Sequence, residues 1–293
     1  SGSKQPCEEI TKRYASQINI HYFFKENSGP ADSRNYGASR SQGEFIIILD
    51  SDCILPPDYL EQVNRAISSR NIEAYGGPDA AHSSFTPTQK AINYAMTSFF
   101  TTGGIRGGKK KMDKFYPRSF NLGITKDAFE KLGGFSADMR FGEDIDFSIR
   151  IYQNNYHCTY LPEAWVYHKR RSNFGQFFKQ VHNSGIARIN LYKKYPASLK
   201  LVHLLPALFT LGTCLLLLGS FFSLWLLTPL IVYSALVFAD SSIQNKSIKI
   251  GALSVEASFV QLLGYGSGFI LAWWRRCVLK QNEFAAFNKT FYK

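Results

Sequence analysis

Apolar positions in the first 200 residues alternate between short strand-like runs and stretches with helical spacing. Residues 18–24 and 45–49 favour strands, and the five consecutive apolar residues of the second run are typical of a buried parallel strand. Residues 57–69 and 143–154 favour helices, the first beginning at a Pro-Pro pair and the second carrying its apolar side chains on one face. The alternation predicts an α/β domain with a mainly parallel sheet, whose ligands bind at the carboxyl ends of the strands.

The hydrophobic pattern changes near residue 200. Residues 201–239 contain no Asp, Glu, Lys or Arg. One crossing of a bilayer needs about 20 apolar helical residues, so this run predicts two transmembrane helices. Gly219-Ser220 is the expected hairpin turn. A buried hairpin in a soluble core is the alternative, although core helices rarely run so long without charge.

A third apolar stretch, residues 251–274, is interrupted by Glu256, Gln261 and three glycines. A third crossing, a re-entrant hairpin and a helix lying in the interface all remain open for it. Trp273-Trp274 followed by Arg275-Arg276 is typical of an interfacial anchor. Since residues 163–200 carry eight Lys or Arg against one Glu, the first 200 residues are expected in the cytosol. A cytosolic C-terminal tail then favours the re-entrant or the interfacial version.

These patterns divide the chain into four predicted regions. They are a catalytic domain (1–172), a basic amphipathic juxtamembrane helix (173–200), a transmembrane hairpin with a third membrane-associated segment (201–274), and a basic tail (275–293).

The net charge of +12 suits nucleic acid, anionic lipid or phosphate-bearing substrates. Much of that charge borders the apolar run and no nucleic-acid motif occurs, so we expect membrane lipids as partners and no nucleic acid. The five cysteines are scattered and form no CxxC pair, which argues against a disulfide framework or a zinc site. A reducing cytosol is the simpler compartment.

Three groups of polar residues could carry chemistry. Asp50-Ser51-Asp52 directly follows the buried strand, where a hard divalent cation would compensate paired carboxylates; an Asp-rich turn with helix capping is the alternative. Glu143 and Asp144 begin a helix, where one could be a general base or both could merely cap it. The basic groups at Arg34 and at 169–171 suit phosphate or are solvated surface charge. The basic stretch 103–114 could meet anionic lipid or be a surface loop.

An ordered series of motifs resembles family 2 glycosyltransferases, which have the GT-A fold. The resemblance runs through most of the soluble region. The matching segments are residues 26–30, 33–37, 43–46, Asp50-Ser51-Asp52, Asn121, 129–135 and 142–144.

The resemblance implies a role for each site residue. Asp50 and Asp52 would lie at the diphosphate of a nucleotide-sugar donor and bind Mn²⁺ or Mg²⁺, with Asp52 as the expected direct ligand and His168 as a further metal or diphosphate contact or a structural histidine. Asp144 would be the general base of an inverting displacement. The remaining implied contacts are Arg34 and Ser51 to the donor, and Gly134, Glu143, Arg170 and Arg171 to the acceptor or a phosphate.

Two departures from the family pattern refine these expectations. The chain opens at Ser1-Gly2-Ser3, which resembles the tail of the family's first Asp-rich turn, so a strand-helix-strand is expected to be missing before it. No QxxRW motif occurs, which favours transfer of one sugar over polymerisation. The architecture suggests a lipid-linked glycan acceptor in surface polysaccharide synthesis, at the inner membrane of a bacterium with the catalytic domain in the cytosol. A membrane-tethered inactive remnant or binding module is the alternative.

Overall fold

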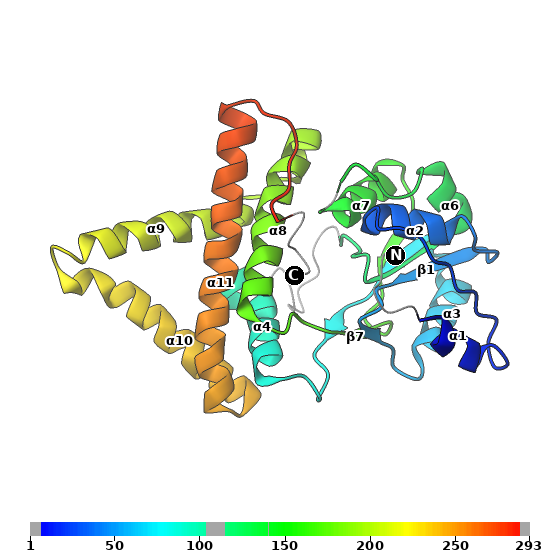
Figure 1. The fold of residues 1–293 in the computed structure, drawn as a ribbon, viewed down its shortest axis with the longest axis horizontal. Coiled ribbons are helices and arrows are strands. Elements are labelled where there is room, and N and C mark those ends of the chain that lie inside the picture. The colour runs from blue at the N-terminus through cyan, green and yellow to red at the C-terminus, as the bar shows by residue number, and fades with distance from the viewer. Residues whose placement is uncertain (1–6, 104–114, 140, 288–293) are drawn as a thin grey trace. The chain divides into compact units, whose positions relative to one another are not determined.

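The computed structural model describes residues 7–103, 115–139 and 141–287. These residues form two compact units, one from residues 1–50, 63–76 and 116–161, and another from residues 51–62, 77–115 and 162–293 (Figure 1). The predicted basic loop lies outside the described residues except for its first glycine, and so do the opening Ser1-Gly2-Ser3 and the end of the basic tail.

The first unit is built on a four-stranded sheet with the order β1-β5-β3-β6. The strands are β1 (Phe45–Leu49), β5 (Asn121–Thr125), β3 (Ala74–Gly76) and β6 (Cys158–Tyr160). β5 pairs antiparallel with both β1 and β3, whereas β3 and β6 pair parallel. The predicted α/β class is confirmed, and three of these four strands share one direction. The sheet is mixed because β5 runs against its neighbours.

The core of this unit lies between the sheet and three helices, α2 (Pro30–Ala38), α6 (Lys126–Lys131) and α7 (Glu143–Gln153). The strand predicted at 45–49 is confirmed as β1, but not as a buried parallel strand: it pairs antiparallel with β5, and only its alternate residues Ile46 and Ile48 are buried. Phe129, Phe135 and Phe147 pack against one another with ring centroids 4.6 to 6.0 Å apart. This apolar cluster fixes α7 on the sheet, and α7 carries the candidate base.

Two further helices occur near the start of the described chain, α1 (Glu8–Tyr14) and α3 (Tyr59–Arg70). α3 confirms the helix predicted after Pro56-Pro57, and α7 confirms the one predicted at 143–154. The strand predicted at 18–24 is wrong, because these residues have no strand partner in the described chain. Phe23 instead packs its ring against Tyr36 of α2, with centroids 6.2 Å apart.

The second unit contains a smaller sheet with the order β2-β7-β4. β2 (Cys53–Ile54) pairs antiparallel with β7 (Val166–His168), which pairs parallel with β4 (Asp79–Ala80). Helices α4 (Pro87–Thr97), α5 (Phe99–Thr102) and α8 (Phe174–Lys194) belong to the same unit. α4 begins with a capping box in which Thr86 and Gln89 bond each other's backbone amides.

Three apolar helices complete this unit: α9 (Leu205–Gly219), α10 (Thr228–Asn245) and α11 (Ile248–Trp273). Among the described residues, the segments 201–219, 224–245 and 248–278 are long and apolar enough to cross a membrane. α9 ends at Gly219, where the hairpin turn was predicted. α9 and α10 project as a hairpin, whereas α11 runs beside α8 (Figure 1).

The third apolar segment is one continuous helix, so the re-entrant hairpin considered for it is wrong. Its glycines serve close packing instead of a turn. A Cβ on Gly268 would collide with the backbone of His182 in α8, and one on Gly266 would collide with the backbone of Pro206 in α9. Small residues let helix backbones approach, which explains why three glycines occur here without breaking the helix.

Candidate functional site

The first part of the candidate site is built around Arg34 of α2. Its Nη2 donates to Asp50 Oδ1 at 2.9 Å, and its Nη1 donates to Glu143 Oε1 at 2.8 Å. Burial acts to lower the pKa of the Arg34 guanidinium, but the two carboxylates outweigh it and raise that pKa. Three residues predicted to contact donor or acceptor groups are therefore brought together, with a fixed positive charge between two negative ones.

Glu143 and Asp144 form the first turn of α7, which the chain enters through Gly142 at a φ of 86°. Burial, and then the neighbouring charge of Asp144, raise the pKa of Glu143 to about 7 against the opposing effect of Arg34. Asp144 Oδ2 lies 2.8 Å from Arg118 Nε. The predicted base is thus a mostly buried carboxylate with a cation beside it.

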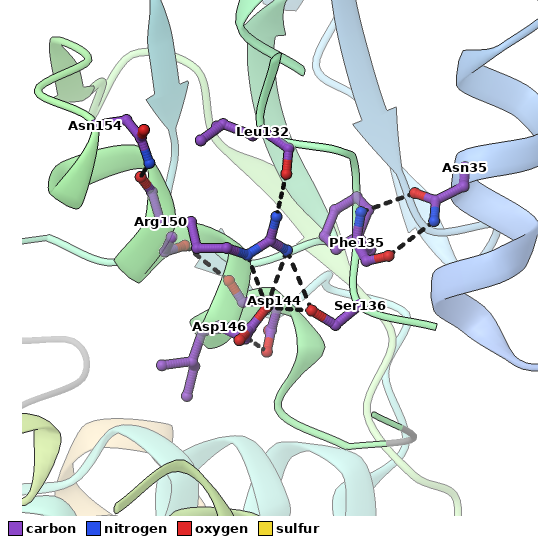
Figure 2. Close-up of polar contacts among 10 residues, drawn as sticks. Asn35, Leu132, Phe135, Ser136, Asp144, Asp146, Arg150 and Asn154 are labelled. Carbon is purple, nitrogen blue, oxygen red and sulfur yellow. Dashed lines mark hydrogen bonds and ion pairs between the residues drawn. The ribbon is translucent and has the colours of Figure 1, made fainter. Parts of the chain in front are cut away.

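A buried polar network holds this helix in place (Figure 2). Asp146, with none of its surface exposed, accepts hydrogen bonds from Arg150 Nε at 3.0 Å and from Ser136 Oγ at 2.6 Å. The Arg150 Nη1 donates to Leu132 O at 2.6 Å. The network ties α7 to the segment after α6, and so fixes the backbone that presents Asp144.

Gly134 lies in that same segment, at a φ of 65°, and Asn35 of α2 fills the space that a Cβ would need. Asn35 exchanges two 2.8 Å hydrogen bonds with the backbone of Phe135. The position therefore requires glycine for a turn with positive φ. Its predicted contact with a phosphate stays a prediction.

A separate group of candidate residues is in the second unit, at the paired strands β2 and β7. Asp52, Cys53 and His168 each offer one ligand atom, and these atoms all lie within 4.8 Å of one another. His168 Nε2 is 3.4 Å from Asp52 Oδ1. Burial acts to raise the pKa of Asp52, but the hydrogen bond and charge of His168 outweigh it and the pKa is lowered. An ionised carboxylate beside an imidazole is a donor pair that fits a divalent cation.

A carboxylate and an arginine lie behind this histidine. Asp79 Oδ2, from β4, lies 3.9 Å from His168 Nδ1 and 2.6 Å from Arg170 Nη2. Arg170 is buried and also donates to Asn93 Oδ1 at 2.9 and 3.1 Å. The 3.9 Å separation between Nδ1 and Asp79 is longer than a hydrogen bond. The predicted phosphate contact of Arg170 stays a prediction, since Asp79 and Asn93 already engage its guanidinium.

Arg171 contributes its charge to the same place, because it acts electrostatically to lower the pKa of Asp52. Ser51 is exposed in the turn between the two aspartates. Asp50 pairs with Arg34 and is not part of the ligand group that Asp52 forms. Its assignment as a metal ligand stays a prediction.

Sequence reasoning missed Cys53, Asp79 and Arg118. Cys53 directly follows the predicted metal motif, which was a usable signal. Asp79 and Arg118 carried none, since each reaches its partner only through pairing of segments far apart in the chain.

Comparison with known proteins agrees with this architecture. Residues 1–133 match the model of the Glycosyl transferase family 2. Glycosyltransferase AglE of Haloferax volcanii is 23% identical over 214 residues, which are 72% of this chain and 68% of that protein. An uncharacterized glycosyltransferase of Haemophilus influenzae is 29% identical over 157 residues, and the chain spans only half of its length.

Among solved structures, the mannosyltransferase PcManGT from Pyrobaculum calidifontis, in complex with GDP-Man and Mn²⁺, superposes with a TM-score of 0.62. The alignment covers 94% of this chain and 76% of that one at 14% identity. The likeness shows a common GT-A-like fold that extends beyond the first 133 residues. Residues 1–133 therefore form a domain that matches the glycosyl transferase family 2.

Proposed function

We propose that this chain is a metal-dependent, inverting glycosyltransferase that moves one sugar from a nucleotide-sugar donor to a lipid-linked glycan acceptor. The observation that carries the proposal is the ligand group at β2 and β7, where an ionised Asp52 lies 3.4 Å from the Nε2 of His168. Asp52 follows β1, which ends at Leu49, and this is where the family 2 resemblance expects the metal. A GT-A neighbour that holds GDP-Man and Mn²⁺ supports this class of donor and cofactor.

Asp52 and His168 would hold the divalent cation, Mn²⁺ or Mg²⁺. When bound, the cation supplies positive charge that stabilises the departing nucleoside diphosphate. Arg171 adds positive charge near Asp52, so the same region favours an anionic leaving group. Asp50, held by Arg34, would contact the donor.

Asp144 would accept the proton of the acceptor hydroxyl, because its carboxylate lies at the start of α7 on a rigid backbone. The freed oxygen attacks the anomeric carbon on the face opposite the diphosphate, and the configuration inverts. Orientation of the two reactants would provide much of the rate, since positioning alone can lower a barrier by about 7–11 kcal/mol. Glu143 and Arg34 would maintain the charge balance around this base.

The apolar helices support the proposed acceptor and location. Exposed apolar side chains cover α9 and α10, which supports insertion of this hairpin into a bilayer. Basic residues close to the start of α9 would lie on the cytosolic side. A transferase held at that surface suits a polyprenyl-linked glycan in surface polysaccharide synthesis at a bacterial inner membrane.

The proposed base is tested with Asp144→Asn in the full-length protein. We expect nucleoside diphosphate binding to remain within about twofold while sugar transfer falls by about 10²–10⁴-fold, the usual contribution of a general base. Asp127→Asn on α6 is the matched control, because that aspartate is exposed and pairs with Lys131 on the surface. Wild-type turnover in Asp144→Asn would exclude the base assignment. An inactive remnant would show no transfer in the wild type with any donor.

A further inference from the structure

Cys53 lies beside the proposed metal ligands, and its place is fixed by strand pairing. Cys53 and His168 are partners in the antiparallel register of β2 and β7, so their side chains extend from the same face of the small sheet. Asp52 precedes Cys53 in the turn that leads into β2. The ligand atoms of these three side chains lie within 4.8 Å of one another.

The nitrogen that faces this group is the Nε2 of His168. Its distance to Asp52 Oδ1 is 3.4 Å, whereas Nδ1 is directed to Asp79 at 3.9 Å. Arg170 holds the same Asp79 oxygen at 2.6 Å, which keeps the carboxylate in place behind the ring. Of the two ring nitrogens, Nε2 is therefore the one that faces Asp52.

We infer that the Cys53 thiolate is a third protein ligand of this cation, which makes the site an oxygen, nitrogen and sulfur site. The inference rests on the metal site proposed above and extends it to the class of metal. Oxygen-only sites suit Mg²⁺ and Mn²⁺, whereas a set that includes thiolate and imidazole favours softer ions such as Zn²⁺, Co²⁺ and Cd²⁺. Three protein ligands with an open fourth position is also the arrangement of catalytic zinc sites, in which substrate takes the remaining position.

Coordination requires the thiolate form of Cys53. On binding, the Sγ–H bond breaks, the proton passes to the buffer, and the Sγ–metal bond forms without oxidation or reduction. The site should therefore release one thiol proton for each ion bound.

The test is a titration of the metal-free, full-length protein with Cd²⁺ alone. We expect one Cd²⁺ per chain and an ultraviolet thiolate-to-metal charge-transfer band that saturates together with binding. Cys53→Ser should remove the band and weaken Cd²⁺ binding by at least about tenfold. Cys7→Ser, at an exposed cysteine in α1's N-terminal cap position, is the matched control and should retain both.

A second measurement tests the thiolate ligand in the wild-type protein, without the Cys53→Ser variant. In the wild-type protein, Cd²⁺ should protect Cys53 from alkylation by iodoacetamide, as mapped by mass spectrometry, and a chelator should restore the reaction. Cd²⁺ that binds without the band and without protection of Cys53 would overturn the thiolate ligand while leaving the metal site of Asp52 and His168 intact. No Cd²⁺ or Mn²⁺ binding at all would overturn both.

Discussion

The Nε of Arg118 lies 2.8 Å from Oδ2 of Asp144, the proposed base. Arg118 precedes β5, and the neighbouring Pro117 O accepts a 2.7 Å hydrogen bond from Ser148 of α7. The segment that carries the arginine is therefore fastened to the helix that carries the carboxylate. The ion pair holds Oδ2, and the backbone N–H of Ile145 donates to Oδ1 at 2.9 Å, so both carboxylate oxygens are oriented.

Arg118→Gln should lower kcat for sugar transfer by about tenfold, because a carboxylate that is free to rotate spends less time in the reactive orientation. Binding of the nucleotide should change little. The kcat of Arg118→Lys should lie between those of the wild type and Arg118→Gln, because lysine keeps the positive charge but lacks the planar guanidinium group. Steady-state kinetics measures both variants, with Arg40→Gln on the exposed surface after α2 as the control. An unchanged kcat in Arg118→Gln would show that the pair has no role in positioning.

Glu143 should give the protein a characteristic dependence of stability on pH. Its folded-state pKa is raised to about 7, so the folded protein holds this proton more tightly than the unfolded chain does. The contribution is present at low pH and is lost as the pH rises from the ordinary value of 4.5 through about 7.

Glu143→Gln should therefore gain stability relative to the wild type as the pH is raised across that window. Urea unfolding of the full chain at several pH values measures the difference. Glu130→Gln, an exposed change on α6, should follow the wild-type curve. Parallel curves for the wild type and Glu143→Gln would contradict a raised pKa.

Asp146 should matter for stability more than for chemistry. Asp146→Asn leaves Arg150 without its charged partner inside the network of Figure 2, and breaking such a buried pair costs about 3–5 kcal/mol. The control Asp127→Asn breaks the exposed pair with Lys131 and should cost less than about 1 kcal/mol. Chemical denaturation measures the two free energies of unfolding, and equal values would be inconsistent with a network that fixes α7.

A charged side chain in the middle of α9 should weaken membrane insertion of the α9–α10 hairpin. Leu215 is 69% exposed and lies in the charge-free run of α9. Leu215→Lys should cost about 2.5–3.5 kcal/mol of membrane insertion, a shift of about 100-fold in partitioning. Leu279→Lys, a similar change beyond the last apolar segment, should have a small effect. Flotation of the protein with lipid vesicles measures both, and identical partitioning would argue against insertion of this hairpin.

The local pattern of apolar and polar residues correctly predicted those helices and strands that depend on residues close in sequence. The apolar run 45–49 and the helix from Glu143 followed directly from composition and spacing. Residues 18–24 also have an apolar character, but a strand exists only where a partner strand pairs with it, and none does among the described residues. The glycines of α11 suggested a break in the helix, but they are required because the backbones of other helices approach them closely.

The candidate site shows the same division. Asp52 and Asp144 could be found because each stands at a recognisable end of an element. The partners Asp79 and Arg118 come from segments that only tertiary structure brings near. Cys53 depends on the register of β2 and β7, which sequence spacing does not determine.

The central claim is that a cation at Asp52 and His168 binds the diphosphate of the donor. The most direct measurement is calorimetric titration of the full-length protein with GDP and with UDP, in Mn²⁺ and then in excess chelator. The account predicts that at least one nucleotide binds in Mn²⁺ and that this binding is lost with chelator, in Asp52→Asn and in His168→Ala. Equal affinity in all four conditions would contradict it.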